Sequence, residues 1–562
     1  MSKAAPPLSQ QVAGAMFWNV VLFPLKFLVG FAAGLIVPNL LGLERYGLYI
    51  LITAVAATLG SYVDLGMERA LPRFIPEAAH RFGARGLRRF LGQVLAVKLG
   101  LLLVVILLFN LFSAPLLGFM RDSETSKLEQ ARVGLQQETD PVKQAELREE
   151  IAAHESLIAR LEREGQLYLV AISIMLVMGA VYDVCMRLLV AYFRQRASNA
   201  IDLAMAIIQP ALIIGLVLLG WDVQGVLVAL VVTPIIGVAL AWWRMRRAMA
   251  GLPETGEEAY NCARQLWPRF LSFSGISYLM NLSTWLYDLP FLSLVAAAYL
   301  STRDVGSLGV ASKFVSLFLT YLMVPLTGTQ IPLFAHLYAR KGTAEVQEAF
   351  TVLSQFLLLL LMPAGVGLAL LSPSLVPLFY PSFPPGTATL VVVFVAAMFL
   401  ETAIGTPQQI LQVYERYGIL IAARAAALVV VPLLLLLVPP YGLLGAAIAA
   451  GVARVLSRAI AFVYALLRFP LRYPWRFAGR VLAGSAVMLA VLYPVIYVGG
   501  LGQVGSGWGG KAATLGLDLL LALAGAAIFW AVFRALGGLE PEAKQRLAEL
   551  RFPLKKVLLR LL

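Results

Sequence analysis

The composition of this chain excludes a water-soluble globular protein. Of its 562 residues, 60% are hydrophobic and only 14% are charged, so the chain is more hydrophobic and less charged than a typical soluble domain. The net charge of +14 does not indicate a nucleic-acid binder, because the arginines lie in loops beside apolar segments and not in basic patches with exposed aromatic residues. We infer an integral membrane protein whose basic loops contact anionic lipid headgroups.

Long apolar segments alternate with short loops along the whole chain, and segments of about 20 to 30 such residues cross a bilayer as helices. The first segment follows Lys3, contains Lys26 and has no small-residue cleavage site, so we expect a retained span and not a signal peptide. The pattern predicts an all-α polytopic membrane protein with about fourteen spans, at residues 12–38, 46–69, 89–119, 166–194, 198–219, 224–246, 266–299, 305–338, 349–379, 387–414, 418–438, 441–467, 477–500 and 511–536.

Every second loop is rich in arginine, and such loops stay in the cytoplasm. The segment from Arg81 to Arg89 is one of them, whereas the intervening loops offer few cations, such as Arg45 and Arg303. We therefore expect a multi-pass protein of the bacterial inner membrane with both termini in the cytoplasm.

One outer connection, residues 121–165, is hydrophilic and has the pattern of two helices. The coiled-coil spacing of its apolar residues predicts a helical hairpin outside the membrane, broken near Asp140 and Pro141, which suit a helix start. It is either a solvated insertion without a partner or a docking site for another envelope protein. The two seams are Leu128, Ala131 and Leu135, and Leu147, Ile151, His154, Ile158 and Leu161.

A weak internal repeat divides the chain into two lobes. Leu71-Pro72-Arg73-Phe74 at the end of the second span corresponds to Ile331-Pro332-Leu333-Phe334 at the end of the eighth, and pseudo-symmetric halves are how many transporters build a site and alternate its exposure. The expected parts are an N-lobe at 1–247 with the hairpin 121–165, a cytoplasmic linker at 248–264, a C-lobe at 265–470, two further spans within 475–537 and a basic amphipathic helix on the cytoplasmic surface at 539–562.

Three motifs between the spans carry a resemblance to a known family. They are Glu44-Arg45-Tyr46-Gly47-Leu48-Tyr49, the segment from Asp64 to Phe74 and the segment from Tyr441 to Ala447. From about Gln11 to Arg480 the chain resembles the polysaccharide-transporter branch of the multidrug/oligosaccharidyl-lipid/polysaccharide (MOP) exporter superfamily, with its Wzx-type O-antigen flippases. The resemblance implies two pseudo-symmetric six-helix lobes of the MATE/MurJ kind plus two extra C-terminal helices. It also implies a flippase that moves an undecaprenyl-pyrophosphate-linked oligosaccharide, an O-antigen or other surface-polysaccharide unit of the lipopolysaccharide type, to the outer leaflet.

Charged residues inside the spans are expensive in hydrocarbon and therefore face a cavity, a partner or a functional site. We expect possible pairs between Asp64 and Lys98 and between Asp183 and Arg187. Cations in the spans outnumber anions, so a cationic central cavity suits a phosphate or an acidic sugar. Asp288 and Glu401 are candidates for coupling to H⁺ or Na⁺.

Polar stripes on three spans extend this candidate site. Trp285 and Tyr278 can stack on sugar faces, and Asn281 can bond to hydroxyl groups. The alternative is that such stripes are only hydrogen-bonding seams between helices. The expected substrate-binding residues are Asn19, Lys26, Tyr278, Asn281, Trp285, Lys313, Arg424 and Arg454.

Two other functions stay open at this point. A drug or metabolite antiporter of the same superfamily would use acidic residues to hold organic cations. A membrane glycosyltransferase or ligase would need a catalytic set on a large outer loop, which the chain lacks, so we expect no enzyme. We also expect no metal and no cofactor, because the two cysteines and three histidines are scattered and no Walker motif is present. Transport would then draw on an ion gradient, the membrane potential or a downstream polymerase as partner.

The loop charges give a testable topology, with the hairpin around Thr139 outside and the loop around Arg85 inside. Single cysteines placed at these two positions should label oppositely with an impermeant thiol reagent on intact cells, because the positive-inside rule holds arginine-rich loops in the cytoplasm. Labelling of both positions from the same side would overturn the orientation and the direction of transport.

Overall fold

The computed structural model describes residues 8–137, 140–192, 194–250, 253–255, 266–323, 330, 334, 337, 343–384, 386–497, 505 and 507–538. All regular elements in these ranges are helices, which confirms the all-α class. A bilayer imposes this result, because hydrocarbon offers no partner to backbone N–H and C=O groups and each span must satisfy them internally. The chain divides into two compact units, residues 1–309 and 310–562.

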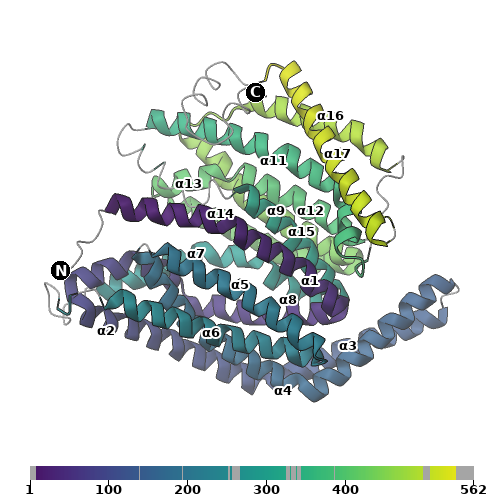
Figure 1. Ribbon diagram of the computed structural model, residues 1–562, viewed down its shortest axis with the longest axis horizontal. Helices are drawn as coiled ribbons and strands as arrows, with labels where there is room; N and C mark the ends of the chain where they lie inside the picture. Colours follow the sequence, from purple (N-terminus) through teal and green to yellow (C-terminus); the bar gives the residue numbers. More distant parts are fainter. Residues whose placement is uncertain are drawn as a thin grey trace. The chain divides into compact units, whose positions relative to one another are not determined.

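The first unit is built from α1 to α8 and the first turns of α9 (Figure 1). In this unit α4 packs on α2 and α6, α1 packs on α5 and α8, and α7 packs on α2. Phe74, Phe90 and Phe270 meet edge to face at the junction of α2 and α7. The helix bounds are α1 Leu8–Asp64, α2 Met67–Leu111, α3 Ser113–Gln137, α4 Pro141–Ala191, α5 Gln195–Leu218, α6 Asp222–Met249, α7 Leu266–Leu286, α8 Leu289–Tyr299 and α9 Thr302–Met323.

The second unit contains the rest of α9 and the helices from α11 onward. Here α12 packs between α11 and α15, while α16 and α17 pack on each other and on α11. The two helices expected beyond the repeat are therefore an integral part of this unit. The bounds are α11 Thr343–Phe379, α12 Gly386–Ala403, α13 Thr406–Val413, α14 Tyr417–Ala425, the 3-10 helix η3 Ala426–Val429, α15 Val430–Arg468, α16 Trp475–Tyr497 and α17 Gly507–Ala535.

The expected spans correspond closely to these helices. Eleven helices among the described residues are long and apolar enough to cross a membrane. Two of them each hold two expected spans, because α1 breaks at Gly42 and α15 breaks at Gly442, where the backbone has positive φ. The expected span 266–299 is divided into α7 and α8. Each of the expected ranges overlaps a helix, so the polytopic architecture is confirmed.

The limits of the lobes stay predictions. Most of the linker 248–264 lies outside the described residues, as do residues 331–333 of the repeat and the tail 539–562. Along the chain, the boundary between the two compact units falls within α9, between Gly309 and Val310. Helices α7 and α8 fall in the first unit because they pack on α2 and α1.

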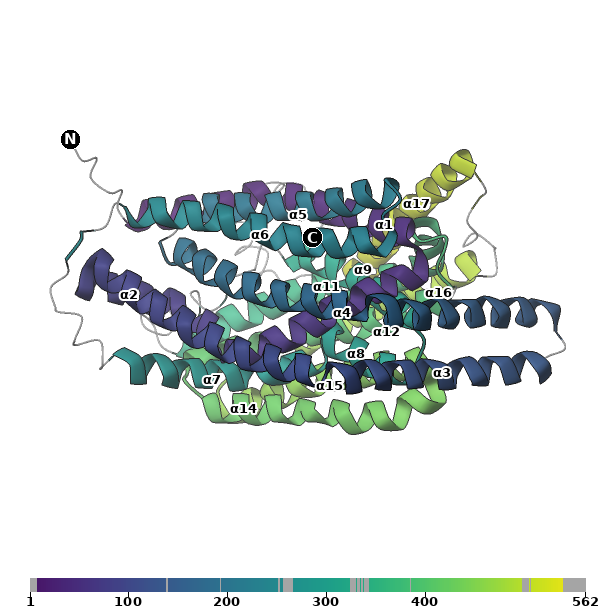
Figure 2. The ribbon, with the colours of Figure 1, turned by 90° about the horizontal axis from the view of Figure 1, so that it is seen from below.

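The expected hairpin is present and is formed by α3 and the first part of α4. Leu128, Ala131 and His154 are buried between the two arms, and Arg132 pairs with Glu155 across them at 2.6 Å. Figure 2 shows the pair extending past the other helices of the first unit. Because α4 runs without a break from Pro141 to Ala191, the hairpin continues directly into a span.

The chain reverses sharply between α1 and α2. Leu65 and Gly66 both have positive φ, 47° and 75°. A Cβ atom at Gly66 would also collide with the carbonyl oxygen of Ser274 on α7. Only glycine combines this backbone conformation with such a close approach.

We expect Gly66→Ala to lower the stability of the protein by about 1–3 kcal/mol, because alanine is strained at positive φ and here also meets a neighbouring backbone. The measurement is the midpoint of thermal unfolding in detergent. Gly92→Ala on α2 is the matched control, since a Cβ atom there meets nothing within 4 Å. Equal midpoints for the two variants would contradict the packing described at Gly66.

Candidate functional site

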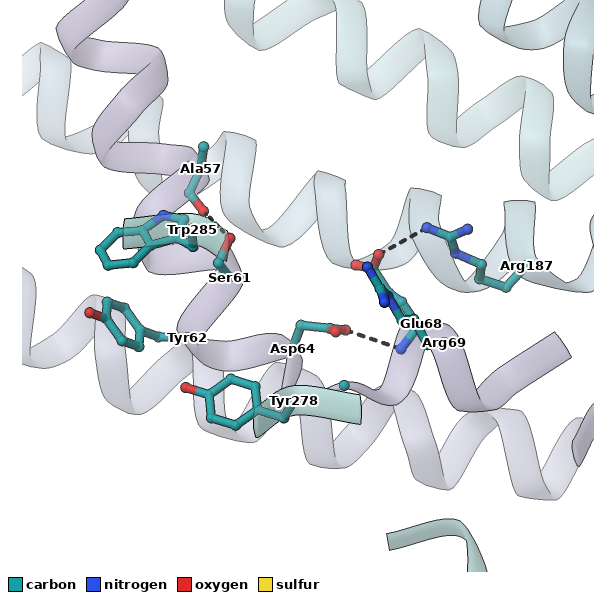
Figure 3. Close-up of a pocket in the computed structure, with 11 residues that line it drawn as sticks. Ala57, Ser61, Tyr62, Asp64, Glu68, Arg69, Arg187, Tyr278 and Trp285 are labelled. Atoms are coloured by element: carbon teal, nitrogen blue, oxygen red, sulfur yellow. Dashed lines mark hydrogen bonds and ion pairs between the residues drawn. The ribbon is translucent and has the colours of Figure 1, made fainter. Parts of the chain in front are cut away.

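A cavity with a volume of about 620 Å³ lies in the first unit. Its walls come from the end of α1, the start of α2, and one or two residues each of α4 and α7 (Figure 3). The lining residues are Ala57, Gly60, Ser61, Tyr62, Asp64, Gly66, Glu68, Arg69, Arg187, Tyr278 and Trp285.

The turn between α1 and α2 places two carboxylates on one wall. The backbone amide of Glu68 donates a hydrogen bond to Oδ1 of Asp64 at 3.2 Å, so the Asp64 side chain satisfies one of the amides that the first turn of α2 leaves without a helical partner. The reversal at Gly66 thereby directs both acidic side chains into the same region.

A network of ion pairs holds this charged end. Lys98 Nζ lies 3.2 Å from Asp64 Oδ1, 3.0 Å from Glu68 Oε1 and 3.7 Å from Asp183 Oδ2. Arg187 binds the other oxygen of Glu68 at 3.0 Å. The Lys98 side chain is only 4% exposed, so its charge depends on these carboxylates in a region where solvation is weak.

The expected pairing is therefore half confirmed. Asp64 and Lys98 are paired as predicted, but the structure places Asp183 against Lys98 and Arg187 against Glu68. Glu68 is the residue that the sequence interpretation missed. Its signal is present in the sequence, since it follows Asp64 by four positions and lies in the motif from Asp64 to Phe74.

The opposite end of the cavity is aromatic. The rings of Tyr62 and Trp285 meet edge to face with centroids 4.9 Å apart, and Tyr278 lies beside them on α7. Figure 3 shows these three side chains on one side and Glu68 and Arg187 on the other. The predicted stacking residues Tyr278 and Trp285 thus line one cavity, whereas the side chain of Asn281 lies outside the described residues.

Two hydrogen-bond donors in this wall lack an acceptor in the described part of the chain. They are Nε1 of Trp285 and Nε of Arg187, and both atoms are buried. An unmet buried donor is costly, but both atoms are covered by protein and neither is exposed to the cavity.

Lys26, the deepest cation predicted on the first span, has a partner. Its Nζ lies 3.1 Å from Asp202 Oδ2 and 3.0 Å from Asn199 Oδ1, and the hydroxyl of Tyr182 donates to the other oxygen of Asp202. The Lys26 charge is therefore compensated, which reduces the expected surplus of cations within the spans. Asp202 escaped notice because it lies near the start of its span. The Asn19 side chain lies outside the described residues.

In the second unit, Arg454 also has a partner, so its charge is compensated as well. Glu401 binds Arg454 Nη1 and Arg458 Nε, each at 3.1 Å. Glu401 and Arg458 line a cavity of about 140 Å³ together with polar residues of α12 and α13. A candidate for ion coupling and a candidate for substrate binding are thus in direct contact.

The remaining candidates occupy separate places. Arg424 is buried on α14, and Lys313 is half-buried on α9. Asp288 occupies the N-cap position of α8 with an extended backbone, which accounts for the break between α7 and α8. The predicted cations are therefore divided between the units, with Lys26 in the first and Arg424 and Arg454 in the second.

Part of this chain matches a known protein family, and its fold is also found in solved structures of a flippase and a transporter. A family model described as "Polysaccharide biosynthesis protein" matches residues 151–382, and a search of curated proteins found no match. Among solved structures, the lipid II flippase MurJ in an inward closed conformation is similar with a TM-score of 0.64 and 14% identity, covering 91% of this chain and 98% of that one.

An inward-facing multidrug resistance MATE family transporter of the MOP superfamily is similar with a TM-score of 0.54 and 14% identity, covering 79% of this chain and 94% of that one. At such identity the likeness shows the fold alone. The family match over residues 151–382 and the shared fold agree with the expected resemblance: that segment is similar to polysaccharide biosynthesis proteins, and the fold of the chain is that of the flippase and the transporter named above.

Proposed function

We propose that this protein is a flippase that moves an undecaprenyl-pyrophosphate-linked oligosaccharide from the cytoplasmic to the outer leaflet by alternating access. The observation that carries the proposal is the two-ended cavity, with Tyr62, Tyr278 and Trp285 at one end and Arg187 at the other. A lipid-linked saccharide presents both chemistries in one headgroup. Aromatic rings stack on sugar faces, and a guanidinium group binds phosphate oxygens.

The comparisons support this substrate class. The matching family model is described by polysaccharide biosynthesis, and one relative in fold is named a lipid II flippase. A lipid-linked saccharide of the O-antigen type satisfies both descriptions.

The proposal also includes a membrane location and a driving force for transport. We place the protein in the bacterial inner membrane with both termini in the cytoplasm, in accord with its arginine-rich loops. A gradient of H⁺ or Na⁺, the membrane potential or consumption of the product by a polysaccharide polymerase would make the movement directional.

One observation favours a second candidate, an antiporter of organic cations. The charged residues that line the cavity include Asp64 and Glu68 as well as Arg69 and Arg187, and carboxylates attract organic cations. The two candidates differ in the effect of the arginines, because only an anionic substrate needs Arg187.

For Arg187 we expect the Gln variant to lower flipping of a fluorescent lipid-linked oligosaccharide in proteoliposomes by roughly tenfold to a hundredfold, the loss typical of a hydrogen bond to a charged group. Arg187→Lys should retain part of the activity, since charge matters before fork geometry. Arg85, whose side chain is 80% exposed, is the control and should tolerate Gln. Normal flipping by Arg187→Gln, or preference of the purified protein for organic cations, would favour the antiporter.

Neutral variants of Lys26, Arg424 and Arg454 should each lose flipping while the protein stays folded, because cations inside spans face a cavity, a partner or a functional site. Because Lys26 and Arg454 bind carboxylates, each test needs a paired variant. Lys26→Gln with Asp202→Asn, and Arg454→Gln with Glu401→Gln, remove the stranded negative charge. Double variants that stay inactive indicate a substrate contact, whereas recovery of flipping in the double variants would reduce these cations to structural ion pairs.

We also expect Asp288 or Glu401 to couple transport to an ion. Asp288→Asn or Glu401→Gln should abolish the response of reconstituted protein to an imposed H⁺ or Na⁺ gradient, because a neutral amide can neither exchange a proton nor neutralise Na⁺. The measurement is initial flipping rate with and without the gradient. Undiminished ion dependence in both variants would place the coupling elsewhere.

A further inference from the structure

The hairpin formed by α3 and the first part of α4 has no counterpart in the pattern that carries the family resemblance. Its arms pack on each other through Leu128, Ala131 and His154. It is also fixed to the rest of the first unit: Gln224 at the start of α6 donates to Glu164 at 3.0 Å. The hairpin is therefore anchored at its base and not a loosely attached insertion.

A second anchor joins the hairpin to α8. Lys127 of α3 donates from Nζ to the carbonyl oxygens of Ala297 and Leu300, at 3.0 and 2.8 Å. These carbonyls belong to the last turn of α8 and the residue after it, where a helix leaves acceptors unpaired and carries partial negative charge. A half-buried lysine at this position satisfies two acceptors and complements the helix dipole.

Helix α8 in turn supports the aromatic wall of the cavity. Phe291 in its first turns contacts Trp285 with ring centroids 4.9 Å apart, and Trp285 contacts Tyr62 at the same separation. Trp285 is only 9% exposed, so its orientation follows its neighbours. Because α8 has only 11 residues, a shift at its last turn is transmitted to Phe291.

We propose that Lys127 is a positioning residue, through which the hairpin fixes α8 and thereby holds the Trp285 ring in the cavity wall. The hairpin then acts as a brace on the site. Loss of the Lys127 contact loosens the aromatic end of the cavity and leaves the ion pairs of Lys98 at the charged end in place. The structural part of this proposal stands on the contacts alone, while its effect on substrate rests on the proposed function.

The first test measures the wall directly. Ser61 lines the cavity next to Trp285 (Figure 3). In protein whose native cysteines are replaced, Ser61→Cys is reacted with a maleimide in nanodiscs. Lys127→Met should raise the reaction rate about threefold, the shift in equilibrium expected when one contact between a cation and a helix end is lost. Lys127→Arg should restore the rate of the protein with Lys127.

Lys143→Met, at an exposed position on the other arm of the hairpin, is the matched control and should leave the rate unchanged. Lys127→Gln, which keeps one donor group without the charge, provides a milder variant if the Met protein is not recovered folded. A rate in folded Lys127→Met or Lys127→Gln equal to that of the Lys143→Met control overturns the proposal.

The second test connects the brace to the ligand. Affinity for an undecaprenyl-pyrophosphate-linked disaccharide is measured for Lys127→Met, Trp285→Ala and the double variant. If Lys127 acts through Trp285, the double variant binds no more weakly than Trp285→Ala alone. Additive losses overturn the route through Trp285. Unchanged affinity in Trp285→Ala alone contradicts the proposed function of the cavity, and the thiol rates still decide the role of Lys127.

Discussion

Lys98 lies among Asp64, Glu68 and Asp183 inside helices that are otherwise apolar, and this burial of charge constrains the whole first unit. Removing one partner of such a group leaves an uncompensated ion at a cost of about 3–5 kcal/mol. The end of α1, the start and the middle of α2 and the end of α4 must therefore stay together. The same contacts form the charged end of the cavity, so stability and substrate recognition depend on one set of side chains. A ligand phosphate that binds Arg187 competes with Glu68 for it, which gives the site a way to respond when it is filled.

The helices and their order could be predicted because hydropathy and length are properties of each segment alone. The hairpin was predictable for the same reason, since its seams and the break at Pro141 are local. The division of the expected span 266–299 into two helices was not predicted, although Asp288 and Pro290 lie where α8 begins. Hydropathy predicted two separate spans in each of the regions that form α1 and α15. It did not show that α1 and α15 are nearly continuous helices that each bend at one glycine.

The site was predicted only where one helix supplied the pattern. Tyr278 and Trp285 share a stripe on α7 and line one cavity. Pairing across helices depends on rotation and register, which spacing within a segment does not contain. Asp183 and Arg187 are one turn apart on α4, yet Arg187 binds Glu68 of α2. Lys26 likewise binds Asp202 of α5, so a count of cations against anions along the sequence gave a surplus that the folded helices partly cancel.

Because α4 is continuous, a small tilt of the helix at one end produces a large displacement of the other end. From Pro141 at the hairpin to Arg187 at the cavity the helix spans 46 steps of about 1.5 Å, or roughly 70 Å. A tilt of about 5° around the cavity end, small for a transporter helix, displaces the far end by roughly 6 Å over that length. The tip of the hairpin therefore magnifies movements of the site, and a spectroscopic probe attached there reports on Arg187 from outside the apolar part of the molecule.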